Sequence, residues 1–128
     1  MSVATGTRTT RAHPHKVVCI LSWIPTLAET RRQLLTADGY TVLSPLGPDG
    51  IAELKHIKQA DLFVLAHSVP IEVKQRAIKL FKGRCGSPVL SLLSPHITKL
   101  PEADYGVEAF NPDEFLAVVK DILGTQSR

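Results

Sequence analysis

The stretch that decides the fold is VVCILSWIPTLAETRRQLLTADGYTV, residues 17–42. It opens with an apolar run, continues from Pro25 with apolar residues at helical spacing, and turns at Asp38-Gly39 into a second short apolar run. A strand, a helix and a second strand in this order are typical of an open α/β sheet, whose binding groups lie where the strands end. Here the first strand ends in Ser22-Trp23, with no carboxylate, thiol or glycine-rich turn.

The same alternation of strand and helix patterns continues along the chain. Near-continuous apolar runs at 61–66 and 88–93 predict, like 17–21, parallel strands that are buried on both faces. Shorter and more mixed runs at 40–44 and 105–110 predict strands at the edges of the sheet. The order of segments favours right-handed crossovers and therefore a doubly wound parallel sheet.

Four segments carry apolar residues at helical spacing, and they predict helices at 25–37, 49–59, 71–82 and 112–123. Asn111 and Pro112 form a start signal for the last helix. The buried face of the first helix is expected to contain Ile24, Leu27, Ala28, Leu34 and Leu35. The connection at 94–104 contains two prolines and is shorter than a helix with its loops requires, so we expect a loop or a single turn there.

Length and composition indicate one globular domain of 128 residues, 44% hydrophobic and 21% charged. No apolar run reaches the roughly 20 residues of a membrane-spanning helix, and the first sixteen residues contain no apolar signal core, so a cytoplasmic protein is expected. Cys19 and Cys85 are too few for a disulfide framework and show no metal-ligand spacing with the histidines.

The formal charge of +3 comes from the first sixteen residues, which contain three basic side chains and no acidic one. The remaining residues contain 12 basic and 12 acidic side chains. We expect residues 1–15 to be a disordered basic tail, residues 16–124 to be the folded domain and residues 125–128 to be a C-terminal tail. Binding to nucleic acid is expected only weakly, through the basic tail, and no membrane partner is expected.

Taken together, these segments resemble the receiver domain of bacterial two-component response regulators, which has the flavodoxin-like, CheY-like fold. The resemblance covers about residues 16–123 and rests on PTLAETRRQLLTADGYTVL (25–43), DLFVLAHSVP (61–70), PVLSLL (88–93) and ADYGVEAFNPDEFLAVVKDIL (103–123). It implies an α/β fold with a doubly wound five-stranded parallel sheet of strand order 2-1-3-4-5, in which the fourth helix is shortened or missing.

Receivers accept a phosphoryl group on an aspartate, and acidic residues at the first strand's tip hold the required Mg²⁺. In this sequence the resemblance places neutral or oppositely charged side chains at the functional positions: Ser22 and Trp23 for the paired acids, Ala66 for the phosphorylated aspartate, Leu93 for the switch hydroxyl (with Ser94 adjacent) and Glu108 for the lysine. The resemblance therefore implies a pseudo-receiver without a phosphorylation site, and Mg²⁺ or another cofactor is not expected.

The function predicted from the resemblance is phosphorylation-independent signalling by a stand-alone pseudo-receiver that binds a protein, such as a histidine kinase or another response regulator. Arg31 and Arg32 on the first helix are predicted partner contacts, and Tyr105 corresponds to the family's aromatic residue on the last strand. Trp23 either fills space at the strand tip or belongs to a binding surface.

The alternative function is the binding of an apolar or aromatic small molecule at the carboxyl ends of the strands, with Trp23, His67 and Ser94 among its contacts. An enzyme is not predicted, because no nucleophile elbow is present and His67 and Ser68 are neighbours on one strand, which directs their side chains to opposite faces.

Overall fold

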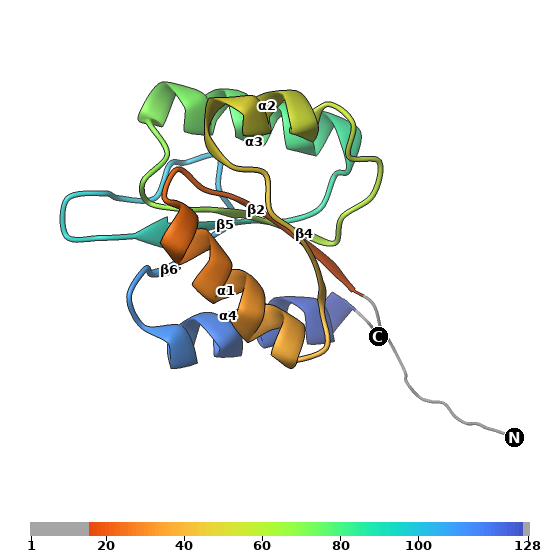
Figure 1. The fold of residues 1–128 in the computed structure, drawn as a ribbon, viewed down its shortest axis with the longest axis vertical. Coiled ribbons are helices and arrows are strands. Elements are labelled where there is room, and N and C mark those ends of the chain that lie inside the picture. Colours follow the sequence, from red (N-terminus) through yellow and green to blue (C-terminus); the bar gives the residue numbers. More distant parts are fainter. Residues whose placement is uncertain (1–15, 127–128) are drawn as a thin grey trace, which may run out of the picture.

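The structure, a computed structural model, describes residues 16–126 and contains one five-stranded parallel sheet (Figure 1). The predicted tail at 1–15 lies outside the described residues. The order across the sheet is β3-β2-β4-β5-β6, which confirms the predicted 2-1-3-4-5 topology. The strands are β2 (Val17–Leu21), β3 (Thr41–Leu43), β4 (Leu62–Leu65), β5 (Val89–Leu93) and β6 (Tyr105–Glu108).

Helices cover both faces of the sheet (Figure 1). On one face lie α1 (Pro25–Ala37) and α4 (Pro112–Gln126), and on the other lie α2 (Gly47–Leu54) and α3 (Ile71–Arg84). This is the doubly wound arrangement that the alternation of segments predicts.

Successive residues of the central strands point into two separate cores, one on each face. In β2, Val18 and Ile20 join the core beneath α1 and α4, while Cys19 and Leu21 join the core beneath α2 and α3. Neighbouring β4 and β5 divide their side chains in the same way. Because both faces are covered, every position in these strands is apolar or small, and the sequence shows near-continuous apolar runs rather than alternation.

The second helix differs from its predicted range of 49–59. It begins at Gly47, whose φ of +67° suits glycine, and it ends at Leu54. Only Ile57 among residues 55–59 is apolar, so continuing the helix would bury little further surface. Ile57 instead packs against the α2–α3 core from a loop, and its carbonyl oxygen accepts a 2.9 Å hydrogen bond from Arg84 Nε.

Ile24 was predicted on the buried face of the first helix, and this prediction is wrong. The residue precedes Pro25, which disfavours a helical backbone, and it adopts an extended conformation with φ −114° and ψ 110°. Its side chain is 37% exposed. At the other end of the domain, α4 continues to Gln126, so residues 125 and 126, predicted in a tail, are helical.

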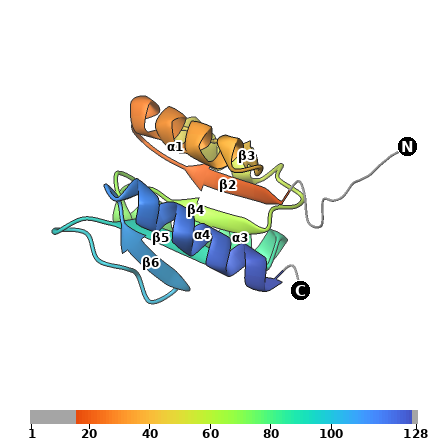
Figure 2. The same ribbon diagram turned by 90° about the horizontal axis from the view of Figure 1, so that it is seen from below.

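The connection between β5 and β6 contains no helix, as the two prolines predict (Figure 2). Its main regular feature is a small turn, in which the backbones of Ser94 and Ile97 exchange hydrogen bonds of 3.3 and 3.0 Å. The fold therefore has four helices around five strands in its described residues. None of the helices within residues 16–126 is long and apolar enough to cross a membrane.

Candidate functional site

The tips of β2 and β4 meet at the carboxyl edge of the sheet. The Ala66 N–H donates to the carbonyl oxygen of Leu21 at 3.0 Å, and the Trp23 N–H donates to Ser68 Oγ at 3.2 Å. Ser22 and Ala66 are fully buried, and Trp23 is half-buried. The structure therefore brings Ser22, Trp23 and Ala66 together at the edge where ligands of doubly wound sheets bind.

The remaining two predicted positions lie at the same edge on the next pair of strands. Leu93 and Glu108 are register partners and end β5 and β6. Leu93 is half-buried and Glu108 is exposed. Ser94 follows β5 directly and begins the small turn.

These residues do not fit the Mg²⁺ that the receiver fold implies. Magnesium prefers carboxylate and other hard oxygen ligands, whereas Ala66 offers a methyl group and Ser22 Oγ lies 3.4 Å from both the nitrogen and the oxygen of Ile24. Within residues 16–126 no group of three or more His, Cys, Asp or Glu side chains is placed to hold a metal ion.

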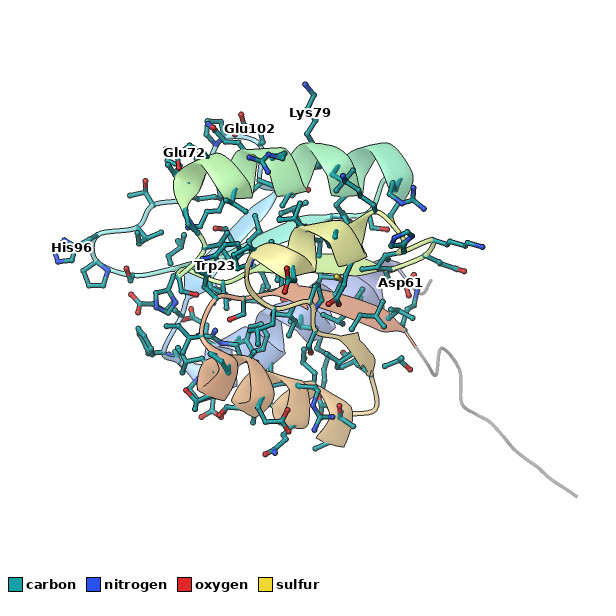
Figure 3. All side chains as sticks on the ribbon, turned by 45° about the horizontal axis from the view of Figure 1, so that its top comes forward. Trp23, Asp61, Glu72, Lys79, His96 and Glu102 are labelled. Atoms are coloured by element: carbon teal, nitrogen blue, oxygen red, sulfur yellow. The ribbon has the colours of Figure 1, made fainter. Side chains whose placement is uncertain are left out.

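Asp61 cannot supply the missing carboxylate, because it lies at the opposite end of the strands from Trp23 (Figure 3). Its Oδ2 accepts a 2.8 Å hydrogen bond from the Val17 N–H, and its own N–H donates to the Val17 carbonyl oxygen at 2.7 Å. Asp61 thus joins the amino ends of β2 and β4.

Trp23 packs against the α2–α3 core. This contact accounts for a tryptophan at the tip of the first strand, because a large apolar side chain there covers part of the core. Its backbone N–H donates to Ser68 Oγ, which fixes the backbone that carries the indole.

The prediction that Arg31 lies on an exposed partner surface is wrong. Its side chain is only 5% exposed, and its Nη2 donates to the carbonyl oxygen of Ala109 at 3.1 Å. Arg31 is spaced four residues from both Leu27 and Leu35, which places it on the apolar face of α1. This helical spacing is the sequence signal that could have revealed its burial.

Lys74 is a second buried cation, which sequence reasoning missed. It is 3% exposed. It lies three and four residues before the buried Ala77 and Ile78 on α3, and this spacing places it on the buried face of the helix. Burial lowers the pKa of both Lys74 and Arg31. Because arginine does not deprotonate in proteins, Arg31 keeps a positive charge that the fold has removed from water.

His67, which follows Ala66, lies within the electrostatic influence of both cations. Burial lowers its pKa most, and the charges of Arg31 and Lys74 lower the pKa further. Its ring packs edge-on against Phe110 with a 4.9 Å centroid separation. His67 follows the end of β4 at the carboxyl edge, so the charges of two buried residues on opposite faces of the sheet both act on this position.

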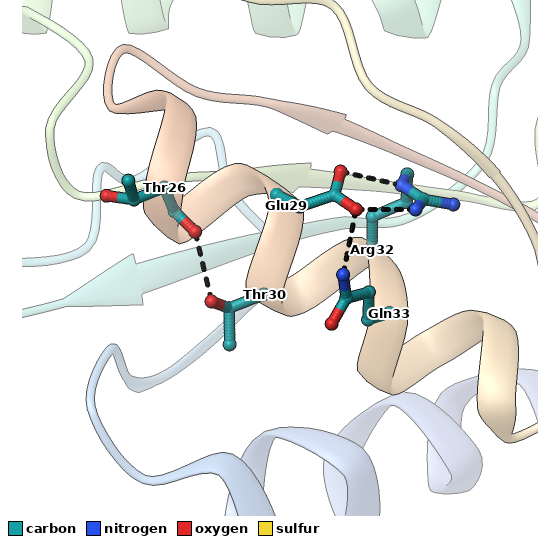
Figure 4. A network of polar contacts seen from close by, with 5 residues as sticks. All are labelled: Thr26, Glu29, Thr30, Arg32 and Gln33. Atoms are coloured by element: carbon teal, nitrogen blue, oxygen red, sulfur yellow. Dashed lines mark hydrogen bonds and ion pairs between the residues drawn. The ribbon is translucent and has the colours of Figure 1, made fainter.

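The exposed face of α1 carries a self-contained polar network (Figure 4). Arg32 Nε and Nη2 donate to the two carboxylate oxygens of Glu29 at 2.9 and 2.6 Å, and Gln33 Nε2 donates to Glu29 Oε2 at 2.9 Å. These hydrogen bonds lower the pKa of Glu29 to about 2. Arg32 is therefore accessible, but its charge is already paired within the helix.

Exposed apolar side chains also gather at the carboxyl edge. Of the five large hydrophobic residues exposed within residues 16–126, four lie in segments that follow strand ends: Ile24, Leu46, Ile71 and Phe110. We call these four residues the apolar rim. The fifth, Tyr105, begins β6, so the structure does not bring it to the edge with the other predicted contacts.

Comparison with known proteins shows similarity in fold to receiver domains. No protein-family model and no curated protein matches the sequence. A two-component response regulator from Clostridium difficile matches with a TM-score of 0.75 and 13% identity, over 89% of this chain and 100% of that chain. A Thermotoga maritima response regulator in complex with Mg²⁺ and BeF matches with a TM-score of 0.65 and 22% identity, over 84% and 98% of the two chains.

The Thermotoga regulator also matches in its complex with a histidine kinase, with a TM-score of 0.66 over 84% of this chain. These solved structures establish the class of fold, which is the CheY-like receiver fold. The similarity concerns the topology and the order of the elements. It does not extend to the identity of the side chains at the carboxyl edge, because the sequences are only 13% and 22% identical.

Proposed function

We propose that this protein is a pseudo-receiver that acts in cytoplasmic signal transduction by binding a protein partner without being phosphorylated. The observation that carries this proposal is that Ser22, Trp23 and Ala66 meet at the carboxyl edge, at the positions where the receiver resemblance places acidic side chains. A phosphoryl acceptor needs a carboxylate nucleophile, and its transition state needs a metal ion or a cation positioned on the transferred group. Ala66 supplies no nucleophile.

The apolar rim supports binding as the remaining activity. Exposed apolar side chains gathered at one edge are typical of interaction sites, because their burial in a complex removes apolar surface from water. Ile71 at 57% and Phe110 at 61% exposure are the most accessible members of the rim. We propose a histidine kinase or another receiver as the partner class, since a solved structure of similar fold is a regulator bound to a kinase.

The first test asks whether the protein accepts a phosphoryl group. We expect no mass increase after incubation with acetyl phosphate and Mg²⁺, and no change in Trp23 fluorescence on titration with Mg²⁺ and beryllofluoride. The Ala66→Asp variant should also remain unlabelled, because the metal ligands and the lysine would still be missing. The Thermotoga regulator serves as the positive control. Efficient Mg²⁺-dependent labelling of either form of the protein would overturn the proposal.

The second test measures partner binding directly. Wild-type protein is assayed by biolayer interferometry against purified histidine kinases and receivers from the same genome, with and without acetyl phosphate. We expect one of them to bind equally well in both conditions, and Ile71→Asp to weaken that complex at least about tenfold, as expected for a buried apolar anchor. Tyr105→Asp is the matched control and should bind normally. Equal loss in both variants would contradict a role for the rim.

A further inference from the structure

Arg31 is a buried cation without an anionic partner among residues 16–126. One nitrogen, Nη2, donates to a neutral carbonyl oxygen, whereas Nη1 is buried and has no hydrogen-bond partner within these residues. Burying an ion without a counter-charge is costly, and arginine does not avoid this cost by losing its proton. An anion on the guanidinium would offset part of this cost.

A cavity of about 160 Å³ lies directly against this side chain, between α1 and the segment that joins β6 to α4. Arg31 and Thr30 form part of its wall, and the rest is apolar: Leu27, Leu34, Ala109, Phe110, Pro112 and Phe115. An apolar cavity of about 150 Å³ accommodates a benzene ring. The cavity therefore has space for a compact apolar group beside a residue whose positive charge is buried, and a ligand would reach the covered Nη1 by a local rearrangement of the lining.

We propose that this cavity binds a small apolar monocarboxylate, with its carboxylate on the guanidinium of Arg31 and its ring or branched chain among the apolar side chains. Guanidinium groups match carboxylates in charge and in planar, bidentate geometry. A small inorganic anion would leave the apolar lining unfilled, and a neutral aromatic molecule would leave the guanidinium unpaired. An apolar body with one carboxylate satisfies both parts of the site.

Phe110 belongs to both the apolar rim and the lining of the cavity. Its side chain is 61% exposed and packs edge-on against the ring of His67. The backbone carbonyl of the preceding residue, Ala109, already holds Nη2 and so orients the guanidinium toward this segment. The site is distinct from the Trp23 position and lies on the α1–α4 side of the sheet.

The proposal is tested by NMR titration of the ¹⁵N-labelled full chain with sodium benzoate. We expect saturable shifts centred on the amides of Leu27, Leu34 and Phe110, with a Kd on the order of 1 mM for so small a ligand. Acetate carries the charge without the ring, and benzyl alcohol carries the ring without the charge. Each should bind at least about tenfold more weakly than benzoate, because each satisfies only one part of the site.

Two arginine variants distinguish binding through the Arg31 guanidinium from non-specific binding to the protein surface. Arg31→Met should weaken benzoate binding at least about tenfold, while Arg32→Met, which alters the next residue on the exposed face, should leave the Kd unchanged. Arg31→Lys keeps the charge and provides a second test if the methionine variant folds poorly. Equal affinity for benzoate and benzyl alcohol, retained binding in both Arg31 variants, or no saturable response to either benzoate or cyclohexanecarboxylate would overturn the proposal.

Discussion

Replacing Phe63 by alanine is expected to lower the free energy of unfolding by about 3–5 kcal/mol. Phe63 lies in the central strand β4, is fully buried, and stacks on Phe81 of α3 with a 4.6 Å centroid separation. Its removal leaves a cavity between the sheet and α3 that neighbouring strands cannot fill, because they are held by hydrogen bonds on both sides of β4. Urea denaturation followed by circular dichroism measures the loss.

The matched control is Phe110→Ala. Phe110 is the same residue type but is mostly exposed, so its truncation should change the free energy of unfolding by less than about 1 kcal/mol. A loss below about 1 kcal/mol for Phe63→Ala as well would mean that the α2–α3 core repacks around the missing ring, and the assignment of Phe63 as its central contact would be wrong.

Replacing Arg31 by methionine is expected to raise the free energy of unfolding by about 1–3 kcal/mol in the absence of ligand. The substitution removes a desolvated charge and keeps a long apolar side chain in nearly the same space. The substitution also removes the hydrogen bond to Ala109, which contributes about 1 kcal/mol to the free energy of unfolding. We expect the desolvation cost that the substitution removes to be larger than this loss. Urea denaturation of the two proteins in benzoate-free buffer checks this result.

Arg32→Met is the control, and its free energy of unfolding should change by less than about 1 kcal/mol, because an exposed ion pair with Glu29 contributes little. If Arg31→Met instead lowers the stability, the guanidinium contributes to the fold through packing and its hydrogen bond. If it raises the stability, Arg31 is a residue whose presence the fold alone does not explain. Such residues are typical of functional sites, where stability and activity compete.

Strand and helix positions could be predicted from the sequence because local patterns encode them. The apolar run at 17–21 matches β2 residue for residue, and Asn111-Pro112 marks the start of α4 as predicted. Asn111 Oδ1 accepts the Glu114 N–H at 3.1 Å, which is the capping contact that the spacing implies. The missing helix between β5 and β6 followed from two prolines and a short segment.

The ends of α2 and the exposure of Ile24 were harder to predict, because both depend on where the chain must turn rather than on which residues are apolar. Gly47 and Pro48 begin α2 two residues before the predicted start, since the backbone has to leave β3 and cross the sheet. Pro25 sets the conformation of the residue before it and so turns Ile24 outward.

The sequence by itself determined the fold class and the strand order implied by its receiver resemblance, and it places Ser22, Trp23 and Ala66 at the positions for which that resemblance predicts acidic residues. These conclusions rest on residue type and spacing. Only the tertiary structure decided that Arg31 and Lys74 are buried and that a cavity lies against Arg31. The physical reason is that burial of a charged residue depends on what packs over its helix, and for Arg31 that covering includes the segment around Ala109, 78 residues further along the chain.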